Sequence, residues 1–78
     1  MRWKDRITAD PAVLVGKPII KGTRISVDFV LSLLAQGWTE DQILENYPQL
    51  QREDLRALFA FVQSCMIEEE YVALGKLG

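Results

Sequence analysis

The feature that most constrains the fold of this chain is a series of three helix-start signals close together, at residues 26, 39 and 51. Ser26 and Thr39 are residue types whose side chains accept hydrogen bonds from the free backbone N–H groups of a first helical turn. Gln42 completes a capping box with Thr39. Gln51 is a weaker cap, but acidic residues follow it in the turn where the helix dipole favours negative charge. The sequence therefore predicts three helices after residue 25.

The first two predicted helices also have stop signals. Gly37 can adopt the positive φ of a C-terminal cap, and Tyr47 precedes Pro48, which disfavours a helical backbone at Tyr47. Each of these helices has room for only about three turns, and helices that short are marginal alone. We therefore expect all three helices to share one hydrophobic core. The residues that we expect in this core are Val30, Leu31, Leu34, Ile43, Leu44, Tyr47, Leu55, Leu58, Phe59 and Val62.

The first 25 residues lack a helical period and contain β-prone runs instead. We expect strands at residues 13–15 and at Pro18–Ile20, on either side of Gly16 and Lys17. The predicted fold class is mainly α: a short N-terminal β-hairpin followed by a three-helix, helix-turn-helix-like bundle. We expect a single domain of residues 1–78, with a hairpin arm at 1–25, the bundle at 26–67 and an acidic, apolar C-terminal tail at 68–78.

Composition argues against several classes of function. With 49% apolar and 26% charged residues among 78, the chain has the balance of one globular domain and is too interrupted by charge for a membrane span. Its start has no apolar export signal, so we expect a cytoplasmic protein. Histidine is absent and Cys65 is the only cysteine, so a metal would have to be bound by carboxylates alone. We expect no cofactor, no small-molecule substrate and, with no nucleophile beside a base, no catalysis.

Charge is unevenly distributed along the chain. Residues 1–24 contain six basic and two acidic residues, a net charge of +4, whereas residues 25–78 contain three basic and nine acidic residues, a net charge of −6. Such polarity suits head-to-tail self-association or two partners of opposite charge. The alternative is that a small protein merely segregates the charges that keep it soluble.

Residues 16–27, GKPIIKGTRISV, invite comparison with a phosphate-binding loop. Such a loop needs G-x-x-x-x-G-K-[ST], whereas here five residues separate the two glycines and the lysine precedes the second one. In a purely structural interpretation the glycines serve turns and the isoleucine pair anchors a hairpin. A cationic hairpin also suits contact with nucleic-acid phosphates. We expect a hairpin first and a contact surface second, with Lys17, Lys21, Thr23 and Arg24 as DNA-binding candidates.

In a helix-turn-helix interpretation the third helix is the DNA-recognition helix, which adds Arg52 and Arg56 to the DNA-binding candidates. Acidic residues in its first turn and in the second helix oppose close approach to phosphates. We therefore expect weak DNA binding by one copy, and stronger binding by a homodimer that combines two basic N-terminal halves.

Several runs of residues together resemble a known family. They are Ile7-Thr8, Asp10-Pro11, the stretch 16–27, the stretch 34–48 (LAQGWTEDQILENYP) and the stretch 53–58 (EDLRAL). Over roughly residues 5–63 the chain is similar to the domain of unknown function 433 family. It departs from the family pattern at Ser26, where proline is common, and at Gln51, where a Thr or Ser cap is usual. The resemblance implies a small bacterial or archaeal protein with a helix-turn-helix-like fold, of the kind often regarded as an antitoxin paired with a PIN-like ribonuclease toxin.

The C-terminal tail combines a block of acid with apolar residues. One interpretation is a docking segment that lays apolar side chains in a groove of the toxin and carboxylates over its basic cleft. The alternative is a frayed helix end with solvated charges. The toxin-binding candidates are Glu68, Glu69, Glu70, Tyr71, Val72 and Leu74.

Three hypotheses follow for the function. The leading one is a homo-oligomeric antitoxin-type protein that blocks a PIN-like nuclease and binds its own operator DNA. The second is a free-standing DNA-binding regulator. The third is a module that uses its apolar tail only to form a dimer.

Overall fold

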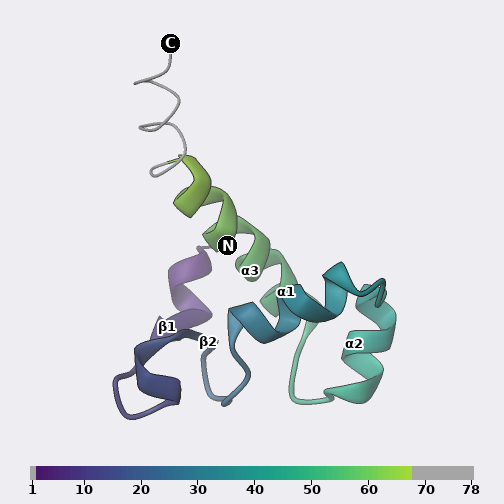
Figure 1. Cartoon of the computed structure of the whole chain (residues 1–78), viewed down its shortest axis with the longest axis horizontal. Helices are drawn as coiled ribbons and strands as arrows, with labels where there is room; N and C mark the ends of the chain where they lie inside the picture. Colours follow the sequence, from purple (N-terminus) through teal and green to yellow (C-terminus); the bar gives the residue numbers. More distant parts are fainter. Residues whose placement is uncertain (1, 68–78) are drawn as a thin grey trace.

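The computed structural model describes residues 2–67, which form three α-helices and a short N-terminal β-hairpin (Figure 1). The predicted fold class is confirmed. Strands β1 (Ile7–Ala9) and β2 (Pro18–Ile20) pair in antiparallel register, with Ile7 opposite Ile20 and Ala9 opposite Pro18. The helices are α1 (Val27–Ala35), α2 (Glu40–Asn46) and α3 (Arg52–Cys65). Single 3-10 turns precede each strand, at Trp3–Asp5 and Leu14–Gly16.

The first strand of the hairpin is not where the sequence pattern placed it. Residues 13–15 do not form a strand, because Leu14 and Val15 adopt positive φ values of 50° and 57°, followed by Gly16 at 78°. These left-handed backbone angles cannot continue a β-strand. Pairing β2 with Ile7–Ala9 instead buries Ile7 and Ile20 to 4% and 1% exposure, so burial outweighs the β propensity of the nearer run.

The predicted helix starts are confirmed. The Ser26 hydroxyl accepts the Phe29 N–H at 2.9 Å and begins α1. Thr39 and Gln42 form the predicted capping box at the start of α2: the Thr39 hydroxyl accepts the Gln42 N–H at 3.1 Å, and the Gln42 side chain accepts the Thr39 N–H at 2.8 Å. Gln51 begins α3 without a side-chain cap of its own.

The turn between α1 and α2 depends on Gly37. Its φ of 99° lets the Gly37 N–H reach the Leu34 carbonyl at 3.0 Å and the Trp38 N–H reach the Leu33 carbonyl at 3.1 Å. This is a Schellman motif, in which a left-handed residue satisfies the last carbonyls of a helix. The second predicted stop is also confirmed, since α2 ends at Asn46 and Tyr47 leaves the helical region.

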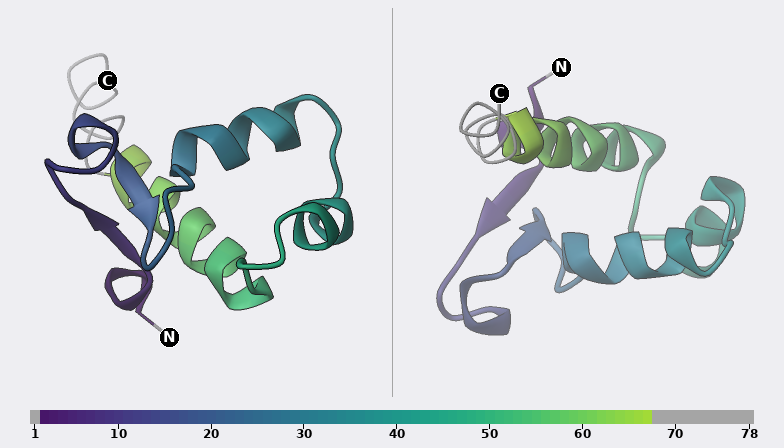
Figure 2. Two further views of the ribbon diagram at one scale, coloured as in Figure 1. Left: turned by 90° about the horizontal axis from the view of Figure 1, so that it is seen from below. Right: turned by 45° about the horizontal axis from the view of Figure 1, so that its top comes forward.

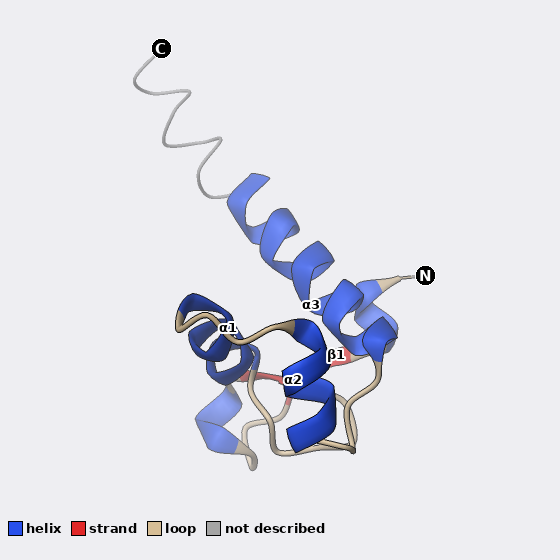
Figure 3. Cartoon of the chain, turned by 90° about the vertical axis from the view of Figure 1, so that its right-hand side faces the viewer, coloured by secondary structure: helices blue, strands red, loops and turns tan. Residues whose placement is uncertain are grey.

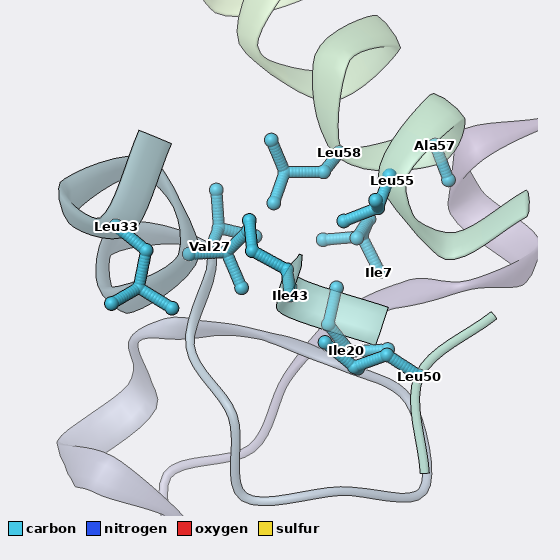
Figure 4. Close-up of a cluster of buried hydrophobic side chains, with 10 residues drawn as sticks. Ile7, Ile20, Val27, Leu33, Ile43, Leu50, Leu55, Ala57 and Leu58 are labelled. Atoms are coloured by element: carbon cyan, nitrogen blue, oxygen red, sulfur yellow. The ribbon is translucent and has the colours of Figure 1, made fainter. Parts of the chain in front are cut away.

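The hydrophobic core lies where the three helices meet the hairpin. In Figure 4, side chains from all these elements point toward one another. Of the predicted core residues, Val30, Ile43, Leu55 and Leu58 are fully buried. Five more are partly buried against this core: Leu31, Leu34, Leu44, Tyr47 and Val62. The sequence pattern missed the other core residues, namely Ile7, Ile20, Val27, Leu33, Leu50 and Ala57.

Phe59 is the one predicted core residue that the structure places outside the core. Its side chain is 44% exposed, while the neighbouring Leu58 is completely buried. The inner face of α3 is defined by Leu55, Leu58 and Val62, and Phe59 lies on the edge of this apolar stripe that turns toward solvent. Within residues 2–67 no helix is long and apolar enough to span a membrane.

Candidate functional site

An apolar groove runs between α1 and the second half of α3. Helix α3 is longer than α1 and α2. Figures 2 and 3 show its C-terminal half extending beyond these two helices. The apolar stripe of α3 continues past the residues that α1 and α2 cover, so the space between the end of this stripe and α1 stays open. The groove has a volume of about 380 Å³. The residues that give it its apolar character are Val27, Leu31, Phe61, Val62, Cys65 and Met66.

The groove has one polar rim. Asp28, in the first turn of α1, lies at this rim, and its carboxylate is 4.0 Å from the ammonium of Lys17. Both side chains are well exposed, at 83% and 61%, so this ion pair contributes little to stability. Trp3 packs edge-on against Phe61, with the ring centroids 5.0 Å apart. Phe61 of the groove is therefore in contact with the N-terminal 3-10 turn.

Large apolar side chains are also exposed beside the groove. Met66 is 53% exposed and Ile67 is 59% exposed, about two helical turns after Phe59, which is 44% exposed. Clusters of exposed large apolar residues are uncommon on small proteins and often mark binding surfaces. Cys65 is half-buried in the groove wall, as a free thiol on the apolar stripe.

The surface formed by α2 and the first turn of α3 is acidic, and Arg52 on this surface is already paired. The Arg52 guanidinium contacts the Asp41 carboxylate at 2.6 Å and the Glu40 carboxylate at 3.6 Å. The hydrogen bond and the charge of Asp41 raise the pKa of Arg52 above its ordinary value. A phosphate would have to displace two carboxylates to reach this side chain, so the structure weakens Arg52 as a DNA-binding candidate.

The remaining DNA-binding candidates fall into different places. Thr23 has a structural role: its hydroxyl donates to the Ile20 carbonyl at 2.8 Å and accepts the Ile25 N–H at 3.0 Å, which shapes the turn after β2. Lys21 and Arg24 are exposed on the same turn, and within residues 2–67 neither makes an ion pair. Arg56 is exposed on α3, away from this turn. Lys21 and Arg24 are thus the two basic DNA-binding candidates that share one exposed turn, whereas Lys17 lies beside Asp28 and Arg56 stands on α3.

One contact had no signal in the sequence. The Arg6 guanidinium bonds the Asp54 carboxylate at 2.9 Å, and Asp54 is the buried acid of the core region. The other Asp54 oxygen accepts the Gln51 N–H at 2.8 Å. This pair joins the hairpin arm to α3, so its role is structural.

The toxin-binding candidates at residues 68–74 lie outside the described part of the chain. Among residues 2–67, no group of three or more Cys, Asp or Glu side chains is placed to hold a metal ion. Every buried side-chain nitrogen and oxygen in that range has a hydrogen-bond partner.

Comparison with known proteins identifies the family. The family model described as "Protein of unknown function (DUF433)" matches residues 7–62. The chain belongs to the DUF433 family. A crystal structure of a DUF433 member protein from Anabaena variabilis ATCC 29413 has 33% sequence identity and a TM-score of 0.74, and the match covers 78% of this chain and 60% of that protein. The chain is also 30% identical over 61 residues to an uncharacterized protein, y4eO, of Sinorhizobium fredii (strain NBRC 101917 / NGR234), covering 78% of this chain and 28% of that protein.

The region that matches the DUF433 family leaves out part of the groove. The chain spans about a quarter of the length of the relative from Sinorhizobium and three fifths of the one from Anabaena. The DUF433 match contains the hairpin, α1, α2 and the first part of α3, and it ends at Val62. Cys65 and Met66, in the outer wall of the groove, lie beyond it.

Proposed function

We propose that this chain is a non-catalytic, antitoxin-type protein that binds and neutralises a PIN-like ribonuclease toxin in the cytoplasm. The observation that carries the proposal is the apolar groove between α1 and α3, whose α3 wall leads in sequence directly into the acidic residues 68–70. An apolar surface followed by a block of carboxylates combines the two properties that an inhibitor of a nucleic-acid enzyme needs.

The physical argument rests on the chemistry of the partner. A ribonuclease holds a polyanionic substrate and therefore presents cations around its cleft. Residues 68–70 supply three negative charges that compete with RNA phosphates for such a cleft. The groove supplies the apolar anchor, because its volume of about 380 Å³ fits a few side chains of a helix or an extended segment. Apolar anchors fix affinity, while charges guide the encounter.

Operator binding is a second candidate function, favoured by one observation. Lys21 and Arg24 are exposed on a single turn, and within residues 2–67 they are not neutralised by acids. A turn of this kind suits phosphate contacts at the edge of a groove of duplex DNA. The recognition-helix alternative is weaker because Glu40 and Asp41 occupy Arg52.

The test is a binding measurement with the PIN-like nuclease encoded beside the gene for this chain. Met66→Gln removes apolar surface from the groove wall without adding charge, and it should weaken nuclease binding about tenfold. Gln63→Ala, on the exposed side of the same helix, is the matched control and should change the affinity less than about twofold. Circular dichroism of both variants checks that the fold is unchanged.

Two results would contradict the proposal. The first is the absence of binding between the purified wild-type chain and that nuclease, or of any such neighbouring gene. The second is equal affinity of the Met66→Gln and Gln63→Ala variants, since the groove would then make no contribution.

A further inference from the structure

A second hollow, separate from the groove, opens beside the first turn of α1. It has a volume of about 370 Å³ and is lined by Leu14, Arg24, Ile25, Ser26 and Phe29. A volume of this size is at the small end of the range for ligand sites, so it suits one flat ring system rather than a long peptide. The hollow and the groove share no lining residue, and nuclease binding makes no use of the hollow.

The apolar part of the hollow is an accessible aromatic surface. Phe29 is 39% exposed, and its ring packs at 83° against that of Tyr47, with the centroids 5.5 Å apart. This contact holds the Phe29 ring in place and leaves part of it open to solvent. Leu14 reaches the hollow from a backbone with a positive φ of 50°, a strained conformation of the kind that is often found at binding sites. The hollow therefore offers a fixed platform on which a flat ring can stack.

The polar part of the hollow is cationic. Arg24 lines it, and Lys21 is exposed on the same turn. Within residues 2–67 neither side chain makes an ion pair, and no carboxylate is among the residues that line the hollow. The Ser26 hydroxyl already accepts the Phe29 N–H at 2.9 Å, so the positive charge comes from the two side chains and not from the start of α1. The matching ligand is anionic and has a flat, apolar body.

We propose that this hollow binds one unpaired base of a single-stranded nucleic acid, with Phe29 stacking on the base and Arg24 and Lys21 contacting the adjacent phosphates. Aromatic stacking combined with cations along the backbone is how proteins bind single strands without reading their sequence. A base inside a duplex is stacked between its neighbours and cannot enter a recess, so the hollow distinguishes single from double strands. An acidic peptide matches the cations equally well, but a base gains more from Phe29 because every base has a flat π-surface.

The inference is independent of nuclease binding, and it differs from operator binding because it requires an unpaired base. Fluorescence anisotropy with three labelled probes tests it: a thymidine octamer, an abasic octamer with the same phosphates, and a duplex of the same length. The wild-type chain should bind the thymidine octamer at least fivefold more tightly than the abasic one, which is the low end for stacking of one base. A uridine octamer should bind within about threefold of the thymidine octamer, since the base and the phosphates are common to DNA and RNA.

Substitutions at Phe29 separate stacking from packing. Phe29→Leu keeps an apolar side chain against Tyr47 but removes the aromatic face, so it should weaken binding of the thymidine octamer at least fivefold. The same variant should change the affinity for the duplex and for the abasic octamer less than about twofold. Phe29→Trp, which keeps an aromatic face, should bind the thymidine octamer at least as well as the wild type. Val15→Asn changes an exposed apolar residue outside the hollow and is the matched control.

Substitutions of the cations measure the phosphate contacts. Lys21→Ala with Arg24→Ala should weaken binding of both octamers and reduce the slope of log affinity against log salt by about 1.4, because each phosphate contact on a single strand contributes about 0.7. Arg2→Ala with Lys4→Ala removes the same charge from exposed positions at the N-terminal turn and should leave that slope nearly unchanged. Circular dichroism of every variant checks the fold.

Two results would overturn the proposal. Equal affinity of the wild-type chain for the thymidine and abasic octamers would mean that no base enters the hollow, and its cations would then suit an acidic peptide instead. Equal weakening of single-strand and duplex binding by Phe29→Leu would mean that Phe29 only supports the position of the turn.

Discussion

Arg6 and Asp54 form an ion pair at 2.9 Å that joins the residue before β1 to the first turn of α3. The Asp54 side chain is only 9% exposed and that of Arg6 is 31% exposed. Asp54 also accepts the Gln51 N–H. The same carboxylate therefore contacts the start of α3 and holds the hairpin arm against this helix. Gln51 makes no side-chain cap, so Asp54 supplies only the reciprocal half of a capping box, the role that Gln42 has at the start of α2.

Asp54→Ala should lower the free energy of unfolding by about 2–3 kcal/mol, because it removes a helix cap and leaves a half-buried guanidinium unpaired. Arg6→Ala should cost less, about 1 kcal/mol, because solvent reaches the arginine and the cap survives. Urea denaturation of both single variants and the double variant measures the coupling. If the two single effects simply add, the ion pair contributes nothing beyond the cap.

The helices were predictable from the sequence because caps and stops are local chemistry. Ser26, Thr39 and Gly37 act on residues within four positions of themselves, so their patterns can be read directly. Contacts between distant residues have no such pattern. Arg6 and Asp54 are 48 positions apart, and β1 is selected by the burial that Ile7 and Ile20 gain together.

The groove was not predictable for a related reason. The apolar period of α3 predicts a stripe, but it does not indicate how far the other elements cover that stripe. Phe59 belongs to the periodic pattern and is nevertheless 44% exposed, because α3 packs on the side of Leu55 and Leu58. The extent to which α1 covers α3 is a property of the assembled fold.

Leu58 and Phe59 offer a direct test of this packing. Leu58→Ala should lower the free energy of unfolding by about 2–4 kcal/mol, since it leaves a cavity in a completely buried site. Phe59→Ala should change it by less than about 1 kcal/mol, because Phe59 is already 44% exposed. Thermal or urea unfolding of the two variants gives the comparison. A larger loss for Phe59 than for Leu58 would mean that α3 packs through its other edge.

The left-handed turn before β2 predicts a stabilising substitution. Val15 has a φ of 57° and is 95% exposed, so it carries backbone strain without any packing in return. Val15→Asn should raise the free energy of unfolding by about 0.5–1 kcal/mol, because asparagine tolerates this region. The same change at Val13, where φ is −119°, is the control and should give no gain. Equal effects at the two positions would remove strain as the explanation.

Cys65 is a natural reporter of the groove. As the only cysteine, half-buried in the groove wall, it should react with N-ethylmaleimide in the free chain. If a segment of the proposed nuclease partner fills the groove, a saturating concentration of that nuclease should slow the alkylation at least tenfold. A Cys65→Ser, Gln63→Cys variant places the thiol on the exposed side of α3 and should react equally fast with and without the nuclease. Unchanged Cys65 reactivity in a saturated complex would place the nuclease elsewhere on the surface.

Any binding of duplex DNA should depend on the turn at residues 21–24 and not on Arg52 at the start of α3. Lys21→Ala with Arg24→Ala removes two exposed cations, so it should weaken binding and reduce the slope of log affinity against log salt by about 2. Arg52→Ala should change affinity less than about twofold, because Asp41 and Glu40 already neutralise that guanidinium. Fluorescence anisotropy with a labelled duplex at several salt concentrations measures both quantities. Loss of binding in Arg52→Ala alone would instead assign the contact to the first turn of α3, with its two carboxylate partners displaced by DNA phosphates.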